Sequence, residues 1–428
     1  MADLIHAADH GQVLAANLFE VHGDDLVAGG LHVRQIVEQT GSPVYIYDGR
    51  IMRNAYRNLS VALDGFASIY YSAKANPAKA VIGLFVAEGA GVEIASLGEY
   101  RSAISAGASP DKIIFAGPGK RRQELETVIA EGIGEIHVEG FDEIERLRSI
   151  KKPVRVSIRI NPVPAVQAGA MRMGGKPTAF GFDEEDLDAV IAAITQVPNV
   201  ELVGIHVYGG TQILDALALI GQWRHSIDLA SRVARMLGRP LATIDLGGGL
   251  GIPYYAIDTH LDLDAIAAAI PDLRSLMAAD PLLSQAHVIV EPGRFLVGEA
   301  GLYVSEVNAV KVSRGTRFVV MEGGMNHHLA ASGNLGQVIK RNYPVVAPAR
   351  MRDAVHAPTT LVGPLCTPLD TLARDALMPD LKVGDLVAVL QSGAYGATAS
   401  PSNFLSHPPA YEVLVEDGQI TPIKRKRC

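Results

Sequence analysis

Eight short apolar runs recur along residues 66–295, and each is rich in β-branched or aromatic residues. Between most of them lie segments, such as residues 77–90 and 142–150, in which apolar residues recur at helical spacing. A strand and a helix repeated eight times predict an α/β fold of the (β/α)8 TIM-barrel type; an open doubly wound sheet normally has fewer strands. The predicted strands cover residues 67–73, 91–96, 112–117, 135–140, 154–162, 201–208, 243–249 and 287–294.

The pattern changes after about residue 300. Apolar and polar residues there alternate with a period of two, in runs separated by Gly, Pro and Asn at residues 303–313, 317–323, 385–393 and 411–426. This alternation predicts a C-terminal antiparallel β domain. We expect the barrel to span residues 45–299, and residues 1–44 to pack with residues 300–428 in the β domain.

Composition and charge narrow the class of protein. The chain has 428 residues, 48% of them hydrophobic and 20% charged, and its net charge is −8, which argues against a nucleic-acid partner. Its two cysteines cannot form a disulfide framework, and no Cys/His spacing typical of a metal site is present. No apolar run approaches the ~20 residues that cross a bilayer, and the first residues lack a signal-peptide pattern. We therefore expect a cytoplasmic enzyme without a metal or a membrane partner.

Reactive side chains follow three of the predicted strands. They are Lys74 after the first strand, Gly247, Gly248 and Gly249 after the seventh, and Glu291 and Arg294 after the eighth. Taken singly, each has a structural explanation as a solvated lysine, a tight turn or a loop. The active sites of such barrels lie at the carboxyl ends of the strands, however, so one rim would hold all of these residues.

Together these groups match the needs of pyridoxal phosphate. Its aldehyde forms a Schiff base with an amine, the role that we predict for Lys74. Its phosphate needs backbone N–H groups that approach closely and a fixed cation, which the three glycines and Arg294 can supply. Its ring nitrogen stays protonated when it faces a carboxylate, a role that we assign to Glu291.

The order of motifs along the chain resembles the fold-type III pyridoxal-phosphate decarboxylases, which include the diaminopimelate, ornithine and arginine decarboxylases. The motifs are "YYSAKAN", "GVEIASLGE", "GPGK", "RINP", "HVYGGTQ", "DLGGGLG", "EPGR", "GGMN", "GPLCTPLD", "SGAYG" and "SNF", spread over roughly residues 40–415. The resemblance implies an alanine-racemase-like barrel with a β domain, decarboxylation of an amino acid, and a homodimer with active sites at its interface. It also implies that Arg159 of "RINP" and Gly293 of "EPGR" contact the cofactor.

The resemblance gives the thiol in "GPLCTPLD" a role. In this family the partner subunit supplies the cysteine of the Gly-Pro-x-Cys motif, here Cys366, to the site built on Lys74. A thiol with an ordinary pKa of roughly 8.5 can return a proton to the α-carbon after CO₂ leaves. Asp370 and Tyr395 are expected to come from the partner as well, with Tyr395 near phosphate or substrate. A buried, inert Cys366 is the structural alternative, and Cys428 belongs to no motif.

The cofactor motifs depart from the family pattern at several positions. Aligning on the glycine before Thr211 places Tyr208, rather than His206, at the position of the family's ring-stacking histidine, and a phenol ring can also stack. Thr211 replaces a serine near the phosphate. Glu93 replaces an aspartate, and Ala179 replaces a lysine.

Other departures concern the substrate. Decarboxylases of basic amino acids carry Asp or Glu directly after the cysteine, whereas this chain has Thr367. The Arg-Pro-x-Leu-Tyr stretch that usually follows "GGMN" is replaced by "HHLAASGN". We expect Thr367, Asp370, Asn326, His327 and His328 to bind substrate; adjacent histidines on a strand would face opposite sides, which disfavours a shared metal.

The leading hypothesis is an α-decarboxylase whose substrate has a neutral or tethered distal end. The chain looks most like the branch that decarboxylates a glutamyl group on an acyl carrier protein in natural-product biosynthesis. A decarboxylase of free diaminopimelate, lysine or ornithine is the alternative, and a racemase on the same fold is less favoured because "GPLCTPLD" suits decarboxylation. A non-catalytic homologue would not need Lys74, Glu291, Arg294 and Cys366 together.

Overall fold

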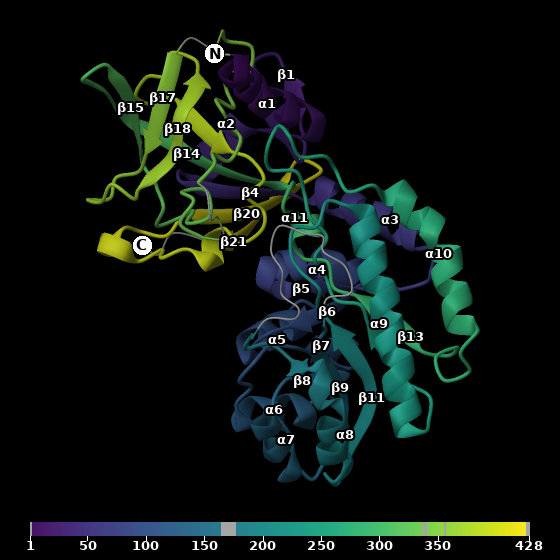
Figure 1. The fold of residues 1–428 in the computed structure, drawn as a ribbon. Coiled ribbons are helices and arrows are strands. Elements are labelled where there is room, and N and C mark those ends of the chain that lie inside the picture. Colours follow the sequence, from purple (N-terminus) through teal and green to yellow (C-terminus); the bar gives the residue numbers. More distant parts are fainter. Residues whose placement is uncertain (1, 164–176, 336, 338–339, 355–356, 425–428) are drawn as a thin grey trace. The chain divides into compact units, whose positions relative to one another are not determined.

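The computed structural model describes residues 2–163, 177–335, 337, 340–354 and 357–424 (Figure 1). Cys428 lies outside these residues. The chain divides into two compact units. The barrel unit comprises residues 55–252 and 259–295, and the β unit comprises residues 1–54, 253–258 and 296–428.

The barrel unit contains eight parallel strands. In spatial order they run β9, β11, β12, β13, β5, β6, β7 and β8, and the pairing of β8 with β9 closes the ring, which confirms the predicted barrel. A two-residue strand, β10 (Phe182–Asp183), adds to β9 outside the ring. The bounds of the ring strands are β5 (Ser68–Ser72), β6 (Gly91–Ile94), β7 (Ile113–Phe115), β8 (Glu135–Val138), β9 (Val154–Asn161), β11 (Val200–Val207), β12 (Thr243–Asp245) and β13 (His287–Val290).

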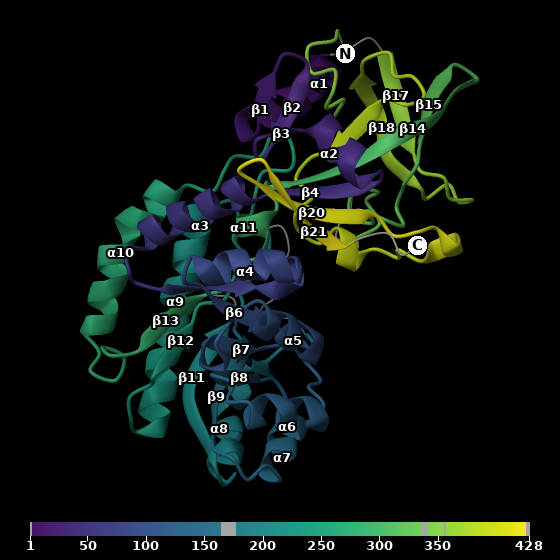
Figure 2. The same ribbon diagram turned by 180° about the vertical axis from the view of Figure 1, so that it is seen from behind.

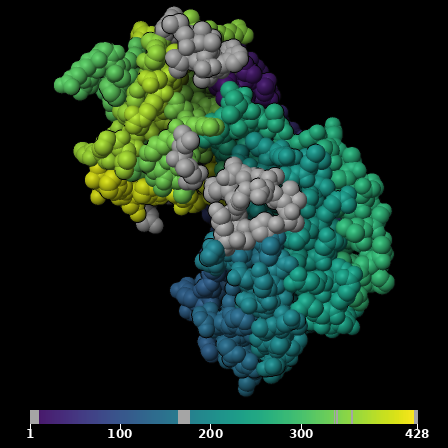
Figure 3. Space-filling view, in the orientation of Figure 1, coloured from purple at the N-terminus to yellow at the C-terminus, as the bar shows by residue number. Residues whose placement is uncertain are grey.

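Helices connect the strands and surround them (Figures 1 and 2). The longest, α9, begins where the Asp215 side chain accepts hydrogen bonds from the N–H groups of Leu217 and Ala218, and it ends at Gly238 in a left-handed conformation. The atoms of α9 and α10 form one outer face of the barrel unit (teal and green, Figure 3). The helices are α3 (Gly49–Leu63), α4 (Lys79–Ala87), α5 (Leu97–Ser105), α6 (Arg122–Ala130), α7 (Phe141–Arg148), α8 (Leu187–Thr195), α9 (Ala216–Leu237), α10 (Leu263–Ala278) and α11 (Arg294–Val297).

The β unit is built on a large sheet of order β18-β17-β15-β14-β4-β20-β21, with β19 pairing with β14 and β16. Most neighbours are antiparallel, but β15 with β17 and β4 with β20 are parallel, so the sheet is mixed. The strands of this sheet are β4 (Val44–Asp48), β14 (Gly301–Ser313), β15 (Thr316–Met321), β16 (Val345–Val346), β17 (Ala357–Val362), β18 (Thr371–Met378), β19 (Leu386–Val389), β20 (Tyr411–Glu416) and β21 (Gln419–Lys424).

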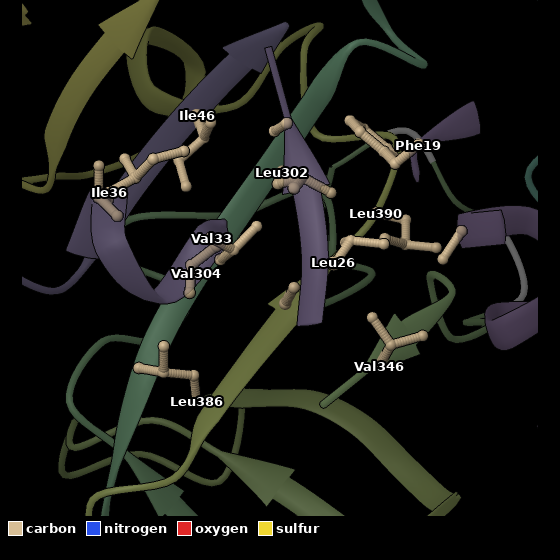
Figure 4. Close-up of a cluster of buried hydrophobic side chains, with 14 of the residues drawn as sticks. Phe19, Leu26, Val33, Ile36, Ile46, Leu302, Val304, Val346, Leu386 and Leu390 are labelled. Atoms are coloured by element: carbon tan, nitrogen blue, oxygen red, sulfur yellow. The ribbon is translucent and has the colours of Figure 1, made fainter. Parts of the chain in front are cut away.

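The N-terminal segment belongs to the β unit and helps to form its core. This segment contains α1 (Ala2–Leu18), β1 (Glu20–His22), β2 (Asp25–Ala28), β3 (Leu31–His32) and α2 (Val33–Thr40). Figure 4 shows Val33 and Ile36 of α2 packed with Ile46 of β4 and with Leu302 and Val304 of β14, all of them buried. The unit boundary therefore falls between residues 54 and 55 rather than at the expected residue 45, because β4 is a central strand of the sheet. No helix in the described part of the chain is both long and apolar enough to cross a bilayer.

Candidate active site

The carboxyl ends of the barrel strands bring the residues predicted around Lys74 to one rim. Lys74 lies in a single 3-10 turn, Ala73–Ala75, that follows β5. Its Nζ atom is 3.5 Å from Oε2 of Glu93, which belongs to the neighbouring strand β6. Glu93 is buried and also accepts a hydrogen bond from the Ser72 hydroxyl, whereas the Lys74 side chain is 42% exposed. The amine is therefore positioned by a buried carboxylate yet remains accessible.

Tyr208 lies at the same rim, directly after β11. Lys74 Nζ and the guanidinium carbon of Arg159 are each 5.7 Å from the centroid of its ring. Arg159 is held in turn by Glu139, at 2.9 Å between Nη1 and Oε1. Burial raises the pKa of Glu139, but the charges of Arg159 and Lys120 outweigh burial and hold this pKa below its ordinary value. Tyr208 is half-buried and so presents an aromatic face beside the amine.

His206, two residues earlier, instead points into the barrel interior, where it meets Glu291 after β13. Its Nε2 atom is 3.3 Å from Glu291 Oε2, and both side chains are buried. Burial lowers the pKa of His206 to about 4. Burial also acts to raise the pKa of Glu291, but the contact with His206, together with His137 and the charge of Lys74, outweighs burial and holds this pKa below its ordinary value. Glu291 is therefore the ionised member of the pair.

The second oxygen of Glu291, Oε1, is buried and accepts no hydrogen bond from an N–H or hydroxyl group of the described residues. The carboxyl group of Asp245, whose pKa is raised, lies within side-chain hydrogen-bonding reach of Glu291 and can share a proton with it. A protonated ring nitrogen is another donor that this buried carboxylate can accept from.

Glu291 belongs to a group of buried polar side chains in the barrel interior. His206 and His137 of β8 face each other through their Nδ1 atoms, 3.0 Å apart, so one of these atoms is protonated and the other is not. A proton on His206 Nε2, which faces Glu291, leaves His206 Nδ1 to accept from His137. Nε2 of His137 faces Glu135 at 3.5 Å and Asp245 at 3.9 Å. Burial, followed by the charge of Glu291, raises the pKa of Asp245.

Atoms of His137, His206 and Glu291 lie within 4.8 Å of one another, a spacing that a metal ion can also use. The direct contact between the two Nδ1 atoms instead describes a hydrogen-bonded chain. Glu139, His137 and Asp245 were not predicted from the sequence. Glu139 and Asp245 could have been found, because Glu139 lies near the end of the predicted strand 135–140 and Asp245 lies two residues before Gly247, at the rim where the other candidates were sought.

The glycines after β12 form a tight backbone cradle. A Cβ atom at Gly248 would lie 2.4 Å from the carbonyl oxygen of Glu291, and one at Gly247 would lie 2.4 Å from the carbonyl oxygen of Val207. Gly247 and Gly249 also have φ values of 71° and 97°, which favour glycine. Within the described residues, the N–H groups of Gly248 and Gly249 have no acceptor. They are available to an anion such as a phosphate.

Three other predicted residues frame this cradle. Gly293 lets the turn after β13 approach β5, since a Cβ atom there would lie 3.0 Å from Cβ of Ala75 and 3.2 Å from Cβ of Ser72. Arg294 begins the short helix α11 and is half-buried, and Thr211 is half-buried in the loop after β11.

The remaining candidates belong to the β unit. Cys366 is a free, exposed thiol in the loop of residues 363–370, and Thr367 beside it is half-buried. Asp370 is buried, and its two oxygens accept hydrogen bonds from the N–H groups of Met325 (2.6 Å) and Leu365 (2.8 Å). Burial raises the pKa of Asp370. This carboxylate therefore holds the loop in shape, a different role from the expected substrate contact.

Asn326, His327 and His328 are also buried and engaged within the β unit. His327 Nε2 lies 2.8 Å from the carbonyl oxygen of Pro408 and 3.2 Å from Asn326 Nδ2. His328 Nε2 lies 2.9 Å from Ser392 Oγ, and burial lowers the pKa of His328 to about 3. The two histidines lie in and directly after a turn, not on a strand as expected. Their contacts favour structural roles. Tyr395 is half-buried with a φ of 53°.

The rim defines a barrel enzyme that carries pyridoxal phosphate, and comparisons with known proteins agree. Residues 50–298 match the family model described as the pyridoxal-binding domain of pyridoxal-dependent decarboxylases. The L-glutamyl-[BtrI acyl-carrier protein] decarboxylase of Niallia circulans is 39% identical over 92% of this chain and 93% of its own length. The diaminopimelate decarboxylase of Methanothermobacter thermautotrophicus is 32% identical over 94% and 93%.

A solved structure shows the same likeness. Diaminopimelate decarboxylase from Helicobacter pylori, complexed with L-lysine, has a TM-score of 0.79 and 28% identity, covering 92% of this chain and 96% of its own. The chain belongs to the pyridoxal-dependent decarboxylase family. It is a carboxy-lyase, and its cofactor is pyridoxal 5'-phosphate.

Proposed function

We propose that this enzyme removes the α-carboxyl group of a glutamyl residue whose distal carboxyl is tethered to an acyl carrier protein, as a step in natural-product biosynthesis. The product would be a 4-aminobutyryl group on the carrier. The observation that carries this proposal is the chemistry of the loop that holds Cys366, residues 363–370.

This loop leaves no carboxylate for a distal ammonium group. Thr367 directly follows Cys366, and its hydroxyl accepts a hydrogen bond from the N–H of Leu369 at 3.3 Å. The only acid in the loop is Asp370, whose two oxygens are engaged by backbone N–H groups. A buried ammonium without a paired carboxylate costs several kcal/mol, on the order of 3. Such a loop disfavours lysine, ornithine and diaminopimelate, and it suits a neutral thioester.

The name of one relative also favours a carrier-bound substrate. The relative at 39% identity is named for a carrier-bound glutamyl substrate, whereas the relative at 32% is named for free diaminopimelate. The latter supports the alternative, a decarboxylase of a free diamino acid.

Each residue of the rim has a separate proposed role. When bound, pyridoxal phosphate withdraws electrons from the α-carbon of the substrate and so permits loss of CO₂. Lys74 would hold the aldehyde, and the ionised carboxylate of Glu291 would keep a proton on the ring nitrogen. The glycine cradle, Thr211 and Arg294 would hold the phosphate, and Tyr208 would stack on the ring.

We further propose a homodimer in which the partner subunit's Cys366 completes the site built on Lys74. The thiol returns a proton to the α-carbon after CO₂ departs. The exposure of Cys366 in its own unit suits a group that acts on a molecule outside that unit. Tyr395 would contribute to the site as well.

The substrate proposal is tested by measuring CO₂ release from a glutamyl-loaded carrier and from free diaminopimelate, lysine and ornithine. We expect kcat/KM for the loaded carrier to exceed that for each free amino acid by at least about 100-fold, a difference of ~2.7 kcal/mol. Thr367→Glu should shift the preference toward the diamino acids, whereas Thr367→Ser should keep it. Efficient turnover of a free diamino acid by the wild type would support the alternative instead.

A further inference from the structure

The β unit contains a cavity of about 460 Å³ that the cofactor chemistry does not use. A cavity of this size can hold a small molecule or an extended chain segment. Its lining comes from His10 of α1, from the loop around Tyr254 and Tyr255, from residues 331–332 and 340–345, and from Leu369 and residues 371–377 of β18. All of these segments belong to the β unit. We call it the tyrosine–arginine pocket.

The pocket lining is strongly cationic. Lys340, Arg341 and Arg374 line it, and Asp375 is the one acid among the described lining residues. The Arg341 guanidinium lies over the Tyr255 ring, 5.0 Å from its centroid, which orients the guanidinium plane. His10, at the edge, has a buried Nε2 atom without a hydrogen-bond partner in the described part of the chain. These groups favour an anion that accepts several hydrogen bonds, such as a phosphate.

The walls of the pocket are largely apolar and aromatic. Tyr254 and Tyr343 pack with their ring centroids 4.8 Å apart, and Leu369, Leu372 and Val345 add aliphatic surface. A free inorganic anion would leave this surface unused. The combination suits a ligand with one phosphate and a longer, weakly polar chain.

Hydrogen bonds fix the pocket in shape. The Asn342 side chain bonds the backbone of Arg374 twice, donating to its carbonyl at 2.6 Å and accepting from its N–H at 2.9 Å. The N–H groups of Tyr254 and Tyr255 both donate to Asp258, at 3.0 and 3.1 Å. Lys340 Nζ donates to Asn334 Oδ1 at 2.6 Å. The side chains and backbone of the pocket therefore need little ordering when a ligand binds.

The pocket directly adjoins the loop that carries Cys366. Leu369 and Thr371 line it and flank Asp370, the residue that clamps the loop. Ala331 and Ser332, which also line it, belong to the "HHLAASGN" stretch where the sequence departs from the family pattern. The pocket therefore reaches the loop that carries Cys366 at Leu369.

We propose that the tyrosine–arginine pocket binds the phosphopantetheine arm of the acyl carrier, with the phosphate at Arg341, Arg374 and Lys340 and the amide chain along the tyrosines. This inference rests on the proposed function, because that function supplies a substrate carried on a phosphorylated arm. The pocket would thus select carrier-bound over free substrates.

A binding experiment tests the pocket independently of turnover. Pantetheine 4'-phosphate and phosphate-free pantetheine are titrated calorimetrically into the holoenzyme. We expect the phosphate to tighten binding about tenfold or more, and Arg341→Ala and Arg374→Ala each to remove most of that gain. Lys311→Ala, which removes an exposed cation from β14, serves as the matched control. Inorganic phosphate that binds as tightly as pantetheine 4'-phosphate, or a phosphate gain that survives both arginine variants, would overturn the assignment.

A kinetic experiment separates this inference from the proposed function. The wild type and Arg341→Ala are assayed with the glutamyl-loaded carrier and with a glutamyl thioester of N-acetylcysteamine, which lacks the phosphate. We expect KM for the carrier to rise about tenfold in the variant, and KM for the short thioester to stay unchanged. Equal effects on the two substrates would contradict the pocket. If the wild type decarboxylates neither thioester, the proposed function fails, while the titration still decides the pocket.

Discussion

The surroundings of Lys74 and of Cys366 give different kinds of evidence about the roles of these two residues. Lys74 is held by Glu93 beside an aromatic ring and a glycine cradle, so its role follows from neighbours in the same unit. Cys366 is exposed, and the loop that presents it is held in shape by Asp370. This exposure supports the proposal that the thiol acts outside its own unit.

Cys366→Ala should separate CO₂ loss from proton return. We expect cofactor content to stay unchanged and turnover to fall by roughly 10²-fold or more, the usual contribution of a positioned acid. Protonation at the wrong carbon should also yield an aldehyde in place of part of the amine. Product analysis with cofactor absorbance measures both, and Cys428→Ala is the control for thiol loss. Wild-type turnover with clean amine in Cys366→Ala would remove the thiol from the mechanism.

At the residue scale, the position of a side chain could be predicted from the sequence where it follows a barrel strand. Lys74, Glu291 and the three glycines meet at one rim because parallel strands share one carboxyl end. It was less informative in the β unit, where Asp370, His327 and His328 are engaged within the fold. Nothing in a short motif shows whether a polar side chain is turned toward substrate or toward the backbone.

At the scale of elements, the loop after β12 has little room for larger side chains. Gly248→Ala places a methyl group 2.4 Å from the Glu291 carbonyl oxygen, so the cradle must open. Such overpacking costs about 1–3 kcal/mol, and we expect cofactor affinity to fall roughly 10- to 100-fold. Equilibrium dialysis of pyridoxal phosphate measures the change. Gly221→Ala, in α9 with open space around the added methyl group, should retain wild-type affinity. Equal affinity in both variants would argue against the cradle.

All eight barrel strands were predicted, because each is a short apolar run next to segments in which apolar residues recur at helical spacing. The parallel pairs β15–β17 and β4–β20 were not predicted. Alternation with a period of two shows which residues share a face, but it is the same in parallel and antiparallel strands. The tyrosine–arginine pocket was missed for a related reason, since its walls come from segments far apart in the sequence.

At the scale of the whole molecule, buried histidines make stability depend on pH. The pKa of His206 is about 4 and that of His328 about 3, both below the unfolded value of 6.5. The unfolded chain therefore binds protons that the folded chain does not. The contribution of these neutral histidines to the free energy of unfolding is fully present above about pH 6.5 and declines as pH falls. His206 accounts for a loss on the order of 3 kcal/mol by pH 4.

Urea unfolding at pH 7, 6 and 5 measures this decline. The pKa of Glu139 lies below its ordinary 4.5, so the titration of this carboxylate affects the free energy of unfolding only at lower pH. His328→Gln should flatten the pH dependence between pH 6.5 and 5, whereas His22→Gln, at a side chain that is 59% exposed, should not. A wild-type midpoint that is constant across this range would contradict the burial of neutral histidines.

The proposed sharing of the site across a dimer predicts complementation between inactive chains. Lys74→Ala and Cys366→Ala should each be nearly inactive, but in a mixed dimer one of the two composite sites would be intact. After full subunit exchange we expect about a quarter of wild-type activity, since half of the dimers are mixed. Differently tagged chains allow mixed dimers to be purified and assayed. Purified mixed dimers without activity would show that the two residues do not act across an interface.

The central claim, decarboxylation of a carrier-bound glutamyl group, is tested most directly by the intact mass of the loaded carrier after incubation with the enzyme. The wild type should lower that mass by one CO₂ while the thioester remains, and Lys74→Ala should leave it unchanged. Consumption of free diaminopimelate, lysine or ornithine by the wild type, with the carrier mass unchanged under the same conditions, would contradict the account.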